Sequence, residues 1–143
     1  MSLNLAVDND NLSVFYEKPL KPLIYIAGRY SDGGTLDHEE KWKNRNVMRY
    51  YSIKFMKRGF AVICPIENDE WAYEDGIITY EDTLESDLAI INKCDAIFFC
   101  PGWEKGKGTL VEHTFAIKNN IEIFHDVPRK ITFDGHGCFP EWE

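Results

Sequence analysis

Short apolar runs alternate along this chain with longer stretches in which apolar residues recur at helical spacing. The apolar runs cover residues 22–28, 60–65, 95–101 and 121–124, and the first three end in glycine or proline. Their length and their β-branched and aromatic content predict buried strands. The third run is continuously apolar between its ends, which is typical of a strand covered on both faces. Residues 130–133 are a candidate fifth strand.

The stretches between these runs predict three helices, at residues 37–58, 81–92 and 110–119. The first two helices have apolar stripes at helical spacing, formed by Val47, Met48, Tyr51 and Phe55 and by Leu84, Leu88 and Ile91. Gly59 is expected to end the first helix, because glycine readily adopts the left-handed conformation found at helix ends.

The alternation of strands and helices predicts right-handed βαβ units, and therefore an α/β fold with an open parallel sheet of four to five strands. Residues 21–143 are expected to form a single domain, after a polar N-terminal arm at residues 1–20 that contains a candidate strand at residues 13–16. Residues 66–80 are acidic and aromatic, and we interpret them as a loop and candidate lid. The tail after residue 133 is expected to be irregular.

Charge and composition narrow the classes of function. The 143 residues have a formal net charge of −8 and no dense Lys/Arg cluster, so we expect no binding to nucleic acid or to an anionic membrane. The sequence contains no apolar segment of membrane-spanning length, which favours a soluble, cytoplasmic protein. The four cysteines form no C-x-x-C pair, and no histidine lies at zinc-finger spacing from them. We therefore expect reduced thiols, no metal and no other cofactor.

Three polar residues are candidates for chemistry near the carboxyl ends of the strands, where open α/β sheets bind ligands. Glu112 either completes a capping box that begins at Thr109, or is a catalytic carboxylate in the first helical turn, where the helix dipole favours the ionised form. Asp87 flanks the apolar stripe of its helix, so it either makes a local hydrogen bond or faces a cavity. Tyr25 lies near the end of the first strand and either fills the core or belongs to the site.

The loops that follow the strands contain glycines and donors that suit a ligand. Gly28, Gly106 and Gly108 allow a ligand to approach the backbone closely. Cations that could meet an anion are Arg29, Lys105 and Lys107. Trp103 and Trp71 either stack on a base or pack on their own loops. Neither a dinucleotide fingerprint nor a P-loop is present.

Together these features resemble the nucleoside 2-deoxyribosyltransferase superfamily, which includes the 2′-deoxynucleoside 5′-phosphate N-hydrolases. The matching stretches are "IYIAGRY" at residues 24–30, "RGFAVICP" at residues 58–65 and "ESDLAIINKCDAIFFCPGWEKGKGTLVEHTFA" at residues 85–116. The resemblance implies a flavodoxin-like three-layer α/β sandwich that forms a homodimer or larger homo-oligomer.

The resemblance also implies roles for residues of this chain. Glu112 corresponds to the nucleophile of the family, Tyr25 to the tyrosine that orients the nucleophile, and Asp87 to the aspartate that handles the nucleobase and its proton. The expected substrate-binding residues are Gly28, Arg29, Gly106, Gly108, Thr109 and Trp103. Gly106 stands where many relatives have a serine, so a 5′-phosphate would depend on Lys105, Lys107 and Thr109.

The resulting hypothesis is an enzyme that cleaves the N-glycosidic bond of a small-molecule nucleoside or nucleotide, as a hydrolase or a deoxyribosyltransferase. Two alternatives stay open at this point. The same fold could be a non-catalytic nucleotide-binding or sensing module, in which Glu112 only caps its helix. It could also be a structural subunit that binds another protein through residues 66–80.

Overall fold

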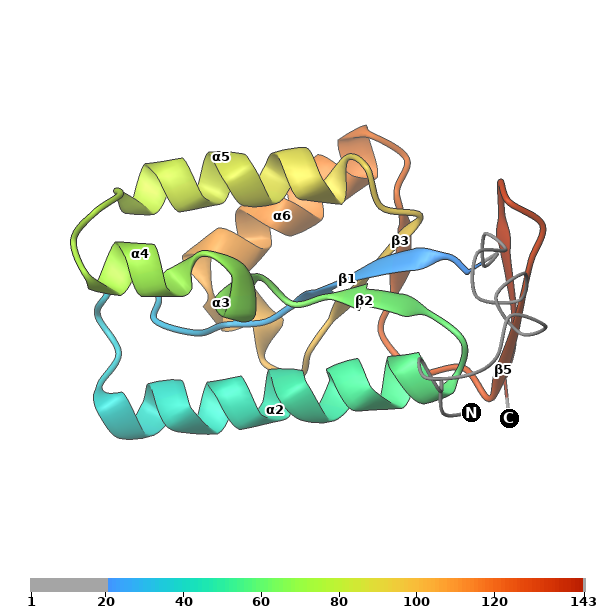
Figure 1. The fold of residues 1–143 in the computed structure, drawn as a ribbon, viewed down its shortest axis with the longest axis horizontal. Helices are drawn as coiled ribbons and strands as arrows, with labels where there is room; N and C mark the ends of the chain where they lie inside the picture. The colour runs from blue at the N-terminus through green and yellow to red at the C-terminus, as the bar shows by residue number, and fades with distance from the viewer. Residues whose placement is uncertain (1–20, 143) are drawn as a thin grey trace, which may run out of the picture.

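Four parallel strands form the centre of the molecule in the computed structural model, which describes residues 21–142 (Figure 1). The strands are β1 (Leu23–Ala27), β2 (Ala61–Ile63), β3 (Ala96–Phe99) and β4 (Glu122–Phe124), in the spatial order β2-β1-β3-β4. β1 is central and pairs in parallel with both β2 and β3. The predicted α/β fold with an open parallel sheet is therefore confirmed. The arm at residues 1–20 and its candidate strand lie outside the described residues.

Helices cover both faces of the sheet and complete a three-layer sandwich. Helix α2 (His38–Lys57) lies on one face, and α5 (Tyr80–Ile91) and α6 (Lys107–Lys118) lie on the other (Figure 1). Side chains alternate along β1, so Ile24 and Ile26 pack on the α2 side while Tyr25 and Ala27 pack on the α5–α6 side. The pleat of β1 therefore directs Tyr25 toward α6.

Helix α2 begins and ends close to the predicted residues. The Asp37 carboxylate accepts a hydrogen bond from the Glu40 N–H at 2.8 Å, which caps the first turn. After the last turn, Gly59 adopts a φ of +99°, and the Phe60 N–H donates to the Phe55 carbonyl. These are the features of a Schellman end, as glycine at this position favours.

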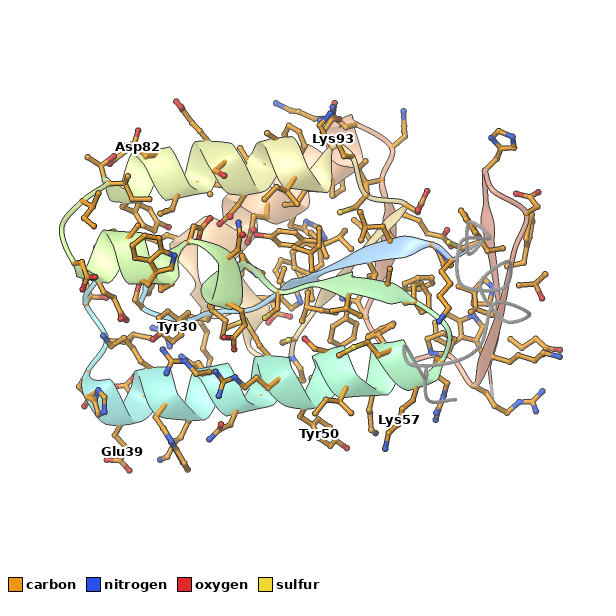
Figure 2. All side chains as sticks on the ribbon, in the orientation of Figure 1. Tyr30, Glu39, Tyr50, Lys57, Asp82 and Lys93 are labelled. Carbon is orange, nitrogen blue, oxygen red and sulfur yellow. The ribbon has the colours of Figure 1, made fainter. Side chains whose placement is uncertain are left out.

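The buried face of α2 differs from the predicted stripe at Val47 and at Ser52. Met48, Ser52 and Phe55 are buried, whereas Val47 is 39% exposed. Ser52 fits the core because its hydroxyl donates to the Met48 carbonyl at 2.8 Å. The opposite face of α2 is also rich in apolar side chains, and Figure 2 shows Tyr50 pointing away from the sheet. Its exposed apolar residues are Trp42, Tyr50, Ile53 and Met56.

Three segments differ from the expectations based on sequence. Residues 66–80 are not an open loop, because α3 (Pro65–Asn68) and α4 (Glu70–Glu74) occupy most of the first half of this segment. Proline at the first position suits the start of α3, since it needs no N–H there. The tail is not irregular: β6 (Cys138–Glu141) pairs antiparallel with β5 (Lys130–Phe133). Residues 130–133 thus form a separate two-stranded sheet and do not extend the parallel one.

Helix α6 begins three residues earlier than predicted. A 3-10 helix, η2 (Trp103–Lys105), follows β3, and Gly106 is the residue before the first turn of α6. Thr109 therefore lies inside the helix and does not cap it. Within residues 21–142, every helix is too short or too polar to cross a bilayer.

Candidate functional site

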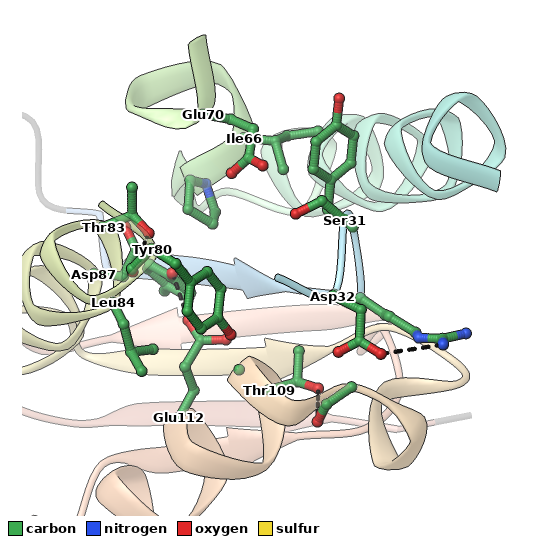
Figure 3. A pocket seen from close by; sticks show the side chains of 17 residues that line it. Ser31, Asp32, Ile66, Glu70, Tyr80, Thr83, Leu84, Asp87, Thr109 and Glu112 are labelled. Carbon is green, nitrogen blue, oxygen red and sulfur yellow. Dashed lines mark hydrogen bonds and ion pairs between the residues drawn. The ribbon is translucent and has the colours of Figure 1, made fainter. Parts of the chain in front are cut away.

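A pocket opens at the carboxyl ends of β1, β2 and β3, between the start of α6 and the facing side of α5 (Figure 3). Its floor contains Tyr25 of β1 and Glu112 of α6. Its walls come from the loop after β1, from α3 and α4, from α5 and from the first turn of α6. These wall residues are Gly28, Arg29, Tyr30, Ser31, Asp32, Pro65, Ile66, Glu70, Tyr80, Thr83, Leu84, Asp87, Gly106, Gly108 and Thr109.

Tyr25 and Glu112 form a buried pair in this pocket. The Tyr25 hydroxyl donates a hydrogen bond of 2.6 Å to Oε2 of Glu112. Tyr25 is fully buried and Glu112 is only 6% exposed. Ala116, one turn further along α6, is buried beside them on the same face. A carboxylate that is held in this way keeps a fixed direction relative to the sheet.

The position of Glu112 corrects both sequence-based interpretations of its helix. Since Gly106 precedes the first turn, Glu112 is in the second turn of α6 and not in the first. No capping box is present, because the Thr109 hydroxyl donates to the carbonyls of Trp103 and Gly106. Capping of the helix start therefore does not explain the position of the Glu112 side chain, whereas its hydrogen bond with Tyr25 does.

Burial controls the protonation of this pair. The pKa of Glu112 is raised from 4.5 to about 7, because burial and, to a smaller extent, the nearby Asp69 raise it more than the hydrogen bond from Tyr25 lowers it. Burial, followed by the negative charge of Glu112, also raises the pKa of Tyr25 well above its ordinary value. Tyr25 therefore stays protonated and remains a donor, while Glu112 changes its charge near neutral pH.

Asp87 of α5 lines the same pocket as Glu112. Burial raises the pKa of Asp87 from 3.8 to about 9, and the neighbouring Asp69 adds to the effect. The Oδ1 atom of Asp87 is buried and has no hydrogen-bond partner within residues 21–142. Asp87 therefore holds its proton at neutral pH, and Asp69, whose Oδ2 is also buried without a partner among the described residues, is the neighbouring carboxyl group that favours the protonated form.

Two glycines at the start of α6 make room for hydroxyl groups. A Cβ atom on Gly106 would lie 2.6 Å from Oγ1 of Thr109, and one on Gly108 would lie 2.7 Å from the hydroxyl of Tyr80. Gly28 is equally restricted, because its Cβ would lie 2.8 Å from the Met48 side chain. All three glycines line the pocket, and the expectation that a ligand approaches their backbone closely stays a prediction.

The structure does not bring Trp103 to the pocket. Its ring stacks on His113 at a centroid distance of 4.4 Å and also packs on Phe99 and His125. Trp103 is therefore part of an aromatic cluster with Phe99, His113 and His125, and it does not line the pocket in which it was expected to contact a ligand. Trp71 is exposed, and its indole N–H donates to the Asn68 carbonyl.

The two lysines of the glycine-rich loop also lie outside the pocket. The residues that line the pocket include Arg29 and Thr109 but neither Lys105 nor Lys107. Lys105 instead lines a separate cavity next to Cys100. Arg29 is paired with Asp32, whose carboxylate lies 3.2 Å from the guanidinium.

The lining residues that sequence reasoning missed include Asp32, Glu70 and Tyr80. The glycines that follow Asp32 predict a loop at this position. Only the fold shows that Asp32 lines the pocket. Glu70 lies in the segment that the sequence suggested was a lid. Burial raises the pKa of Glu70 above its ordinary value, as it does for Glu112 and Asp87.

Metal binding finds no support among residues 21–142, where no three His, Cys, Asp or Glu side chains are arranged to hold an ion. The arrangement instead suits acid–base and nucleophilic chemistry. It offers a carboxyl group that ionises near neutral pH, a second carboxyl group that stays protonated, and a hydroxyl that fixes the first.

The fold and site together define a class: a three-layer α/β sandwich with an acidic pocket at the carboxyl ends of its parallel strands. The chain belongs to the family described as Domain of unknown function (DUF4406), whose family model matches residues 22–125. The matched range includes the whole parallel sheet and the residues Tyr25, Asp87 and Glu112. A search among curated proteins found no match to the chain.

Proposed function

We propose that the protein cleaves the N-glycosidic bond of a nucleoside or nucleotide, with Glu112 as the nucleophile. The observation that carries the proposal is the buried Tyr25–Glu112 hydrogen bond of 2.6 Å, in a pocket that also contains Asp87. The resemblance of residues 24–30, 58–65 and 85–116 to nucleoside 2-deoxyribosyltransferases supports the same assignment of roles.

In the first step, an ionised oxygen of Glu112 forms a bond to the anomeric carbon of the sugar. The bond from that carbon to the base nitrogen breaks, and its electron pair moves to the base. Asp87 supplies the proton that the departing base needs, so the base leaves as a neutral molecule. Glycosidases that form a covalent intermediate divide their reaction in the same way.

In the second step, an acceptor attacks the anomeric carbon and releases Glu112 as a carboxylate. If the acceptor is water, the product is a free sugar and the protein is a hydrolase. If the acceptor is a second base, the product is a new nucleoside and the protein is a transferase. In both cases Asp87, now ionised, takes the proton that the acceptor loses.

The protonation states of the two carboxyl groups support Glu112 as the nucleophile and Asp87 as the general acid. A pKa of about 7 makes a substantial fraction of Glu112 ionised at neutral pH, as a nucleophile requires. A pKa of about 9 keeps Asp87 protonated at the same pH, as a general acid requires. Two carboxyl groups whose surroundings separate their pKa values are a recurrent solution for acid and nucleophile in one site.

The test is to measure free base from a panel of nucleosides and nucleoside 5′-monophosphates. We expect the wild type to release base from at least one of them and Glu112→Gln to release none. Glu85→Gln is the matched control, since Glu85 is an exposed residue of α5, and it should retain wild-type turnover. Binding without base release from any substrate would indicate a non-catalytic module and would overturn the proposal.

A further inference from the structure

Asp32 lies at one end of the pocket, away from Asp87. Figure 3 shows these two carboxyl groups on opposite sides, with Tyr80, Glu112 and Thr109 between them. If Glu112 reacts at the anomeric carbon and Asp87 faces the base, the part of the sugar that carries the 5′ group points toward Asp32. The residue thus stands where a ligand's 5′ substituent would come to rest.

The Asp32 carboxylate occupies a position suited to an anion. Its Oδ1 accepts the Lys107 N–H, in the first turn of α6, at 3.0 Å. Its Oδ2 lies 3.2 Å from the Arg29 guanidinium. A free N–H at a helix start and a guanidinium are the groups that commonly bind phosphate. Here the side chain of Asp32, itself only 10% exposed, takes both donors.

The loop is shaped to hold this contact. Asp32 adopts a φ of 51°, a left-handed value that few residues other than glycine adopt, and Gly33 and Gly34 continue the turn. The Lys107 N–H, followed by Arg29, lowers the pKa of Asp32, so the carboxylate stays ionised at neutral pH. The chain therefore supplies its own anion at this end of the pocket.

The other charges of the pocket also oppose an anionic ligand. Glu70 and Glu112 line it and add negative charge when they are ionised, whereas Asp87 is protonated at neutral pH, and Arg29 is the single lysine or arginine among the described lining residues. Nη2 of Arg29 is paired with Asp32, and its Nε is buried without a hydrogen-bond partner within residues 21–142, so any phosphate that reached Arg29 would lie beside the Asp32 charge. A ligand phosphate would have to displace Asp32 or lie beside its charge.

We propose that Asp32 selects against anionic ligands, so that the substrate is a nucleoside with a free 5′-hydroxyl and not a nucleoside 5′-phosphate. This inference rests on the proposed function for the identity of the substrate. The exclusion of anions by Asp32 is a separate physical property that can be measured without turnover.

The first experiment measures binding of inorganic phosphate by the amide resonances of Lys107 and Gly108 in a chloride buffer. We expect no saturable shift in the wild type at about 10 mM phosphate, a concentration that would nearly saturate a site with a Kd of about 1 mM. Asp32→Gly frees both donors and suits the left-handed φ, so it should show a saturable shift. Adding Arg29→Gln to that variant should abolish the shift.

A matched control is Asp134→Asn. The Asp134 carboxylate accepts two backbone N–H groups, from His136 and Gly137, in a turn outside the pocket. This variant should behave like the wild type. Binding of phosphate to Lys107 by the wild type as tightly as by Asp32→Gly would overturn the proposal, and so would an absence of binding in both.

The second experiment compares kcat/KM for a nucleoside and for its 5′-monophosphate. We expect the wild type to favour the nucleoside by at least about a hundredfold, and Asp32→Asn or Asp32→Gly to reduce that preference by at least about tenfold. A wild type that favours the monophosphate would overturn the inference. If no variant releases base from either compound, the proposed function fails, and the phosphate titration still decides the role of Asp32.

Discussion

Replacement of Tyr25 by phenylalanine removes one hydroxyl and tests whether Tyr25 controls the protonation of Glu112. The lost hydrogen bond is 2.6 Å long and joins two buried side chains. A hydrogen bond to a charged group contributes about 1.5–3 kcal/mol, and about 1.4 kcal/mol corresponds to a change of one in pKa. Because this bond lowers the pKa of Glu112, its loss should raise that pKa from about 7 to about 8–9.

The expected consequence is a loss of activity that depends on pH. At pH 7 the ionised fraction of Glu112 should fall from about a half to between a tenth and a hundredth, so kcat/KM should fall about five- to fiftyfold. The acidic limb of the pH profile should move upward by the same amount, and the deficit should narrow as the pH rises toward 8. Initial rates of base release between pH 5.5 and 9 measure both effects.

The matched control for this substitution is Tyr51→Phe. The ring of Tyr51 packs on Phe98, on the α2 face of the sheet, and lines no part of the site. Its pH profile should coincide with that of the wild type. An activity loss in Tyr25→Phe that is constant across the pH range would refute the reasoning, since Tyr25 would then affect packing and not the charge of Glu112.

Three further predictions concern the carboxyl groups and the assembly. Burial raises the pKa of Glu112 in the folded state, so wild-type stability falls as the pH rises from about 4.5 to about 7. Glu112→Gln should therefore be more stable than the wild type at pH 8, by up to about 3 kcal/mol, but not at pH 4; thermal melts that show the same difference at both pH values would contradict this. Asp87→Asn should slow base release and remove the basic limb near pH 9, because that limb reports the loss of the Asp87 proton; a retained limb in the rate profile would show that another group is the acid. The exposed Trp42 and Tyr50 on α2 favour a homodimer or larger homo-oligomer, so light scattering behind a sizing column should give at least twice 16.6 kDa, and a single mass of 16.6 kDa would exclude it.

The parallel sheet was predictable from sequence because each strand is a compact apolar run between polar segments. The alternation of β and helical patterns leaves few topologies, and the right-handed crossover rule reduces them further. The hairpin of β5 and β6 was harder to predict. The segment Cys138–Glu141 contains a proline and is too short to show a regular alternation of apolar and polar residues. Its pairing with β5 therefore could not be predicted from its own pattern.

The start of α6 could not be located correctly from sequence. Thr109 and Glu112 match a capping box in their spacing, and this local pattern favoured a start near residue 110. In the folded chain, the Thr109 hydroxyl instead donates to the carbonyls of Trp103 and Gly106, which closes the turn between η2 and α6. The same side chains thus fit two local geometries, and the surrounding structure selects between them.

The catalytic candidates were found more readily than the residues that shape the pocket. Glu112 and Asp87 are carboxyl groups on helices that must pack on the sheet. A carboxyl group near the packed face of such a helix is unusual, so both residues can be noticed from the sequence alone. Asp32 carries no such signal, because an aspartate before two glycines is an ordinary turn sequence. Its contact with the Lys107 N–H spans 75 residues and exists only in the folded chain.

The most direct test of the central claim is the detection of sugar bound to Glu112. The wild type is mixed with a cleaved nucleoside, quenched in acid within the first turnover, and digested for mass spectrometry. We predict a sugar adduct on the peptide that contains Glu112, formed at the rate of the first release of base and absent from Glu112→Gln. Turnover of the wild type with no adduct at any time, or an adduct on another residue, would contradict the assignment of Glu112 as the nucleophile.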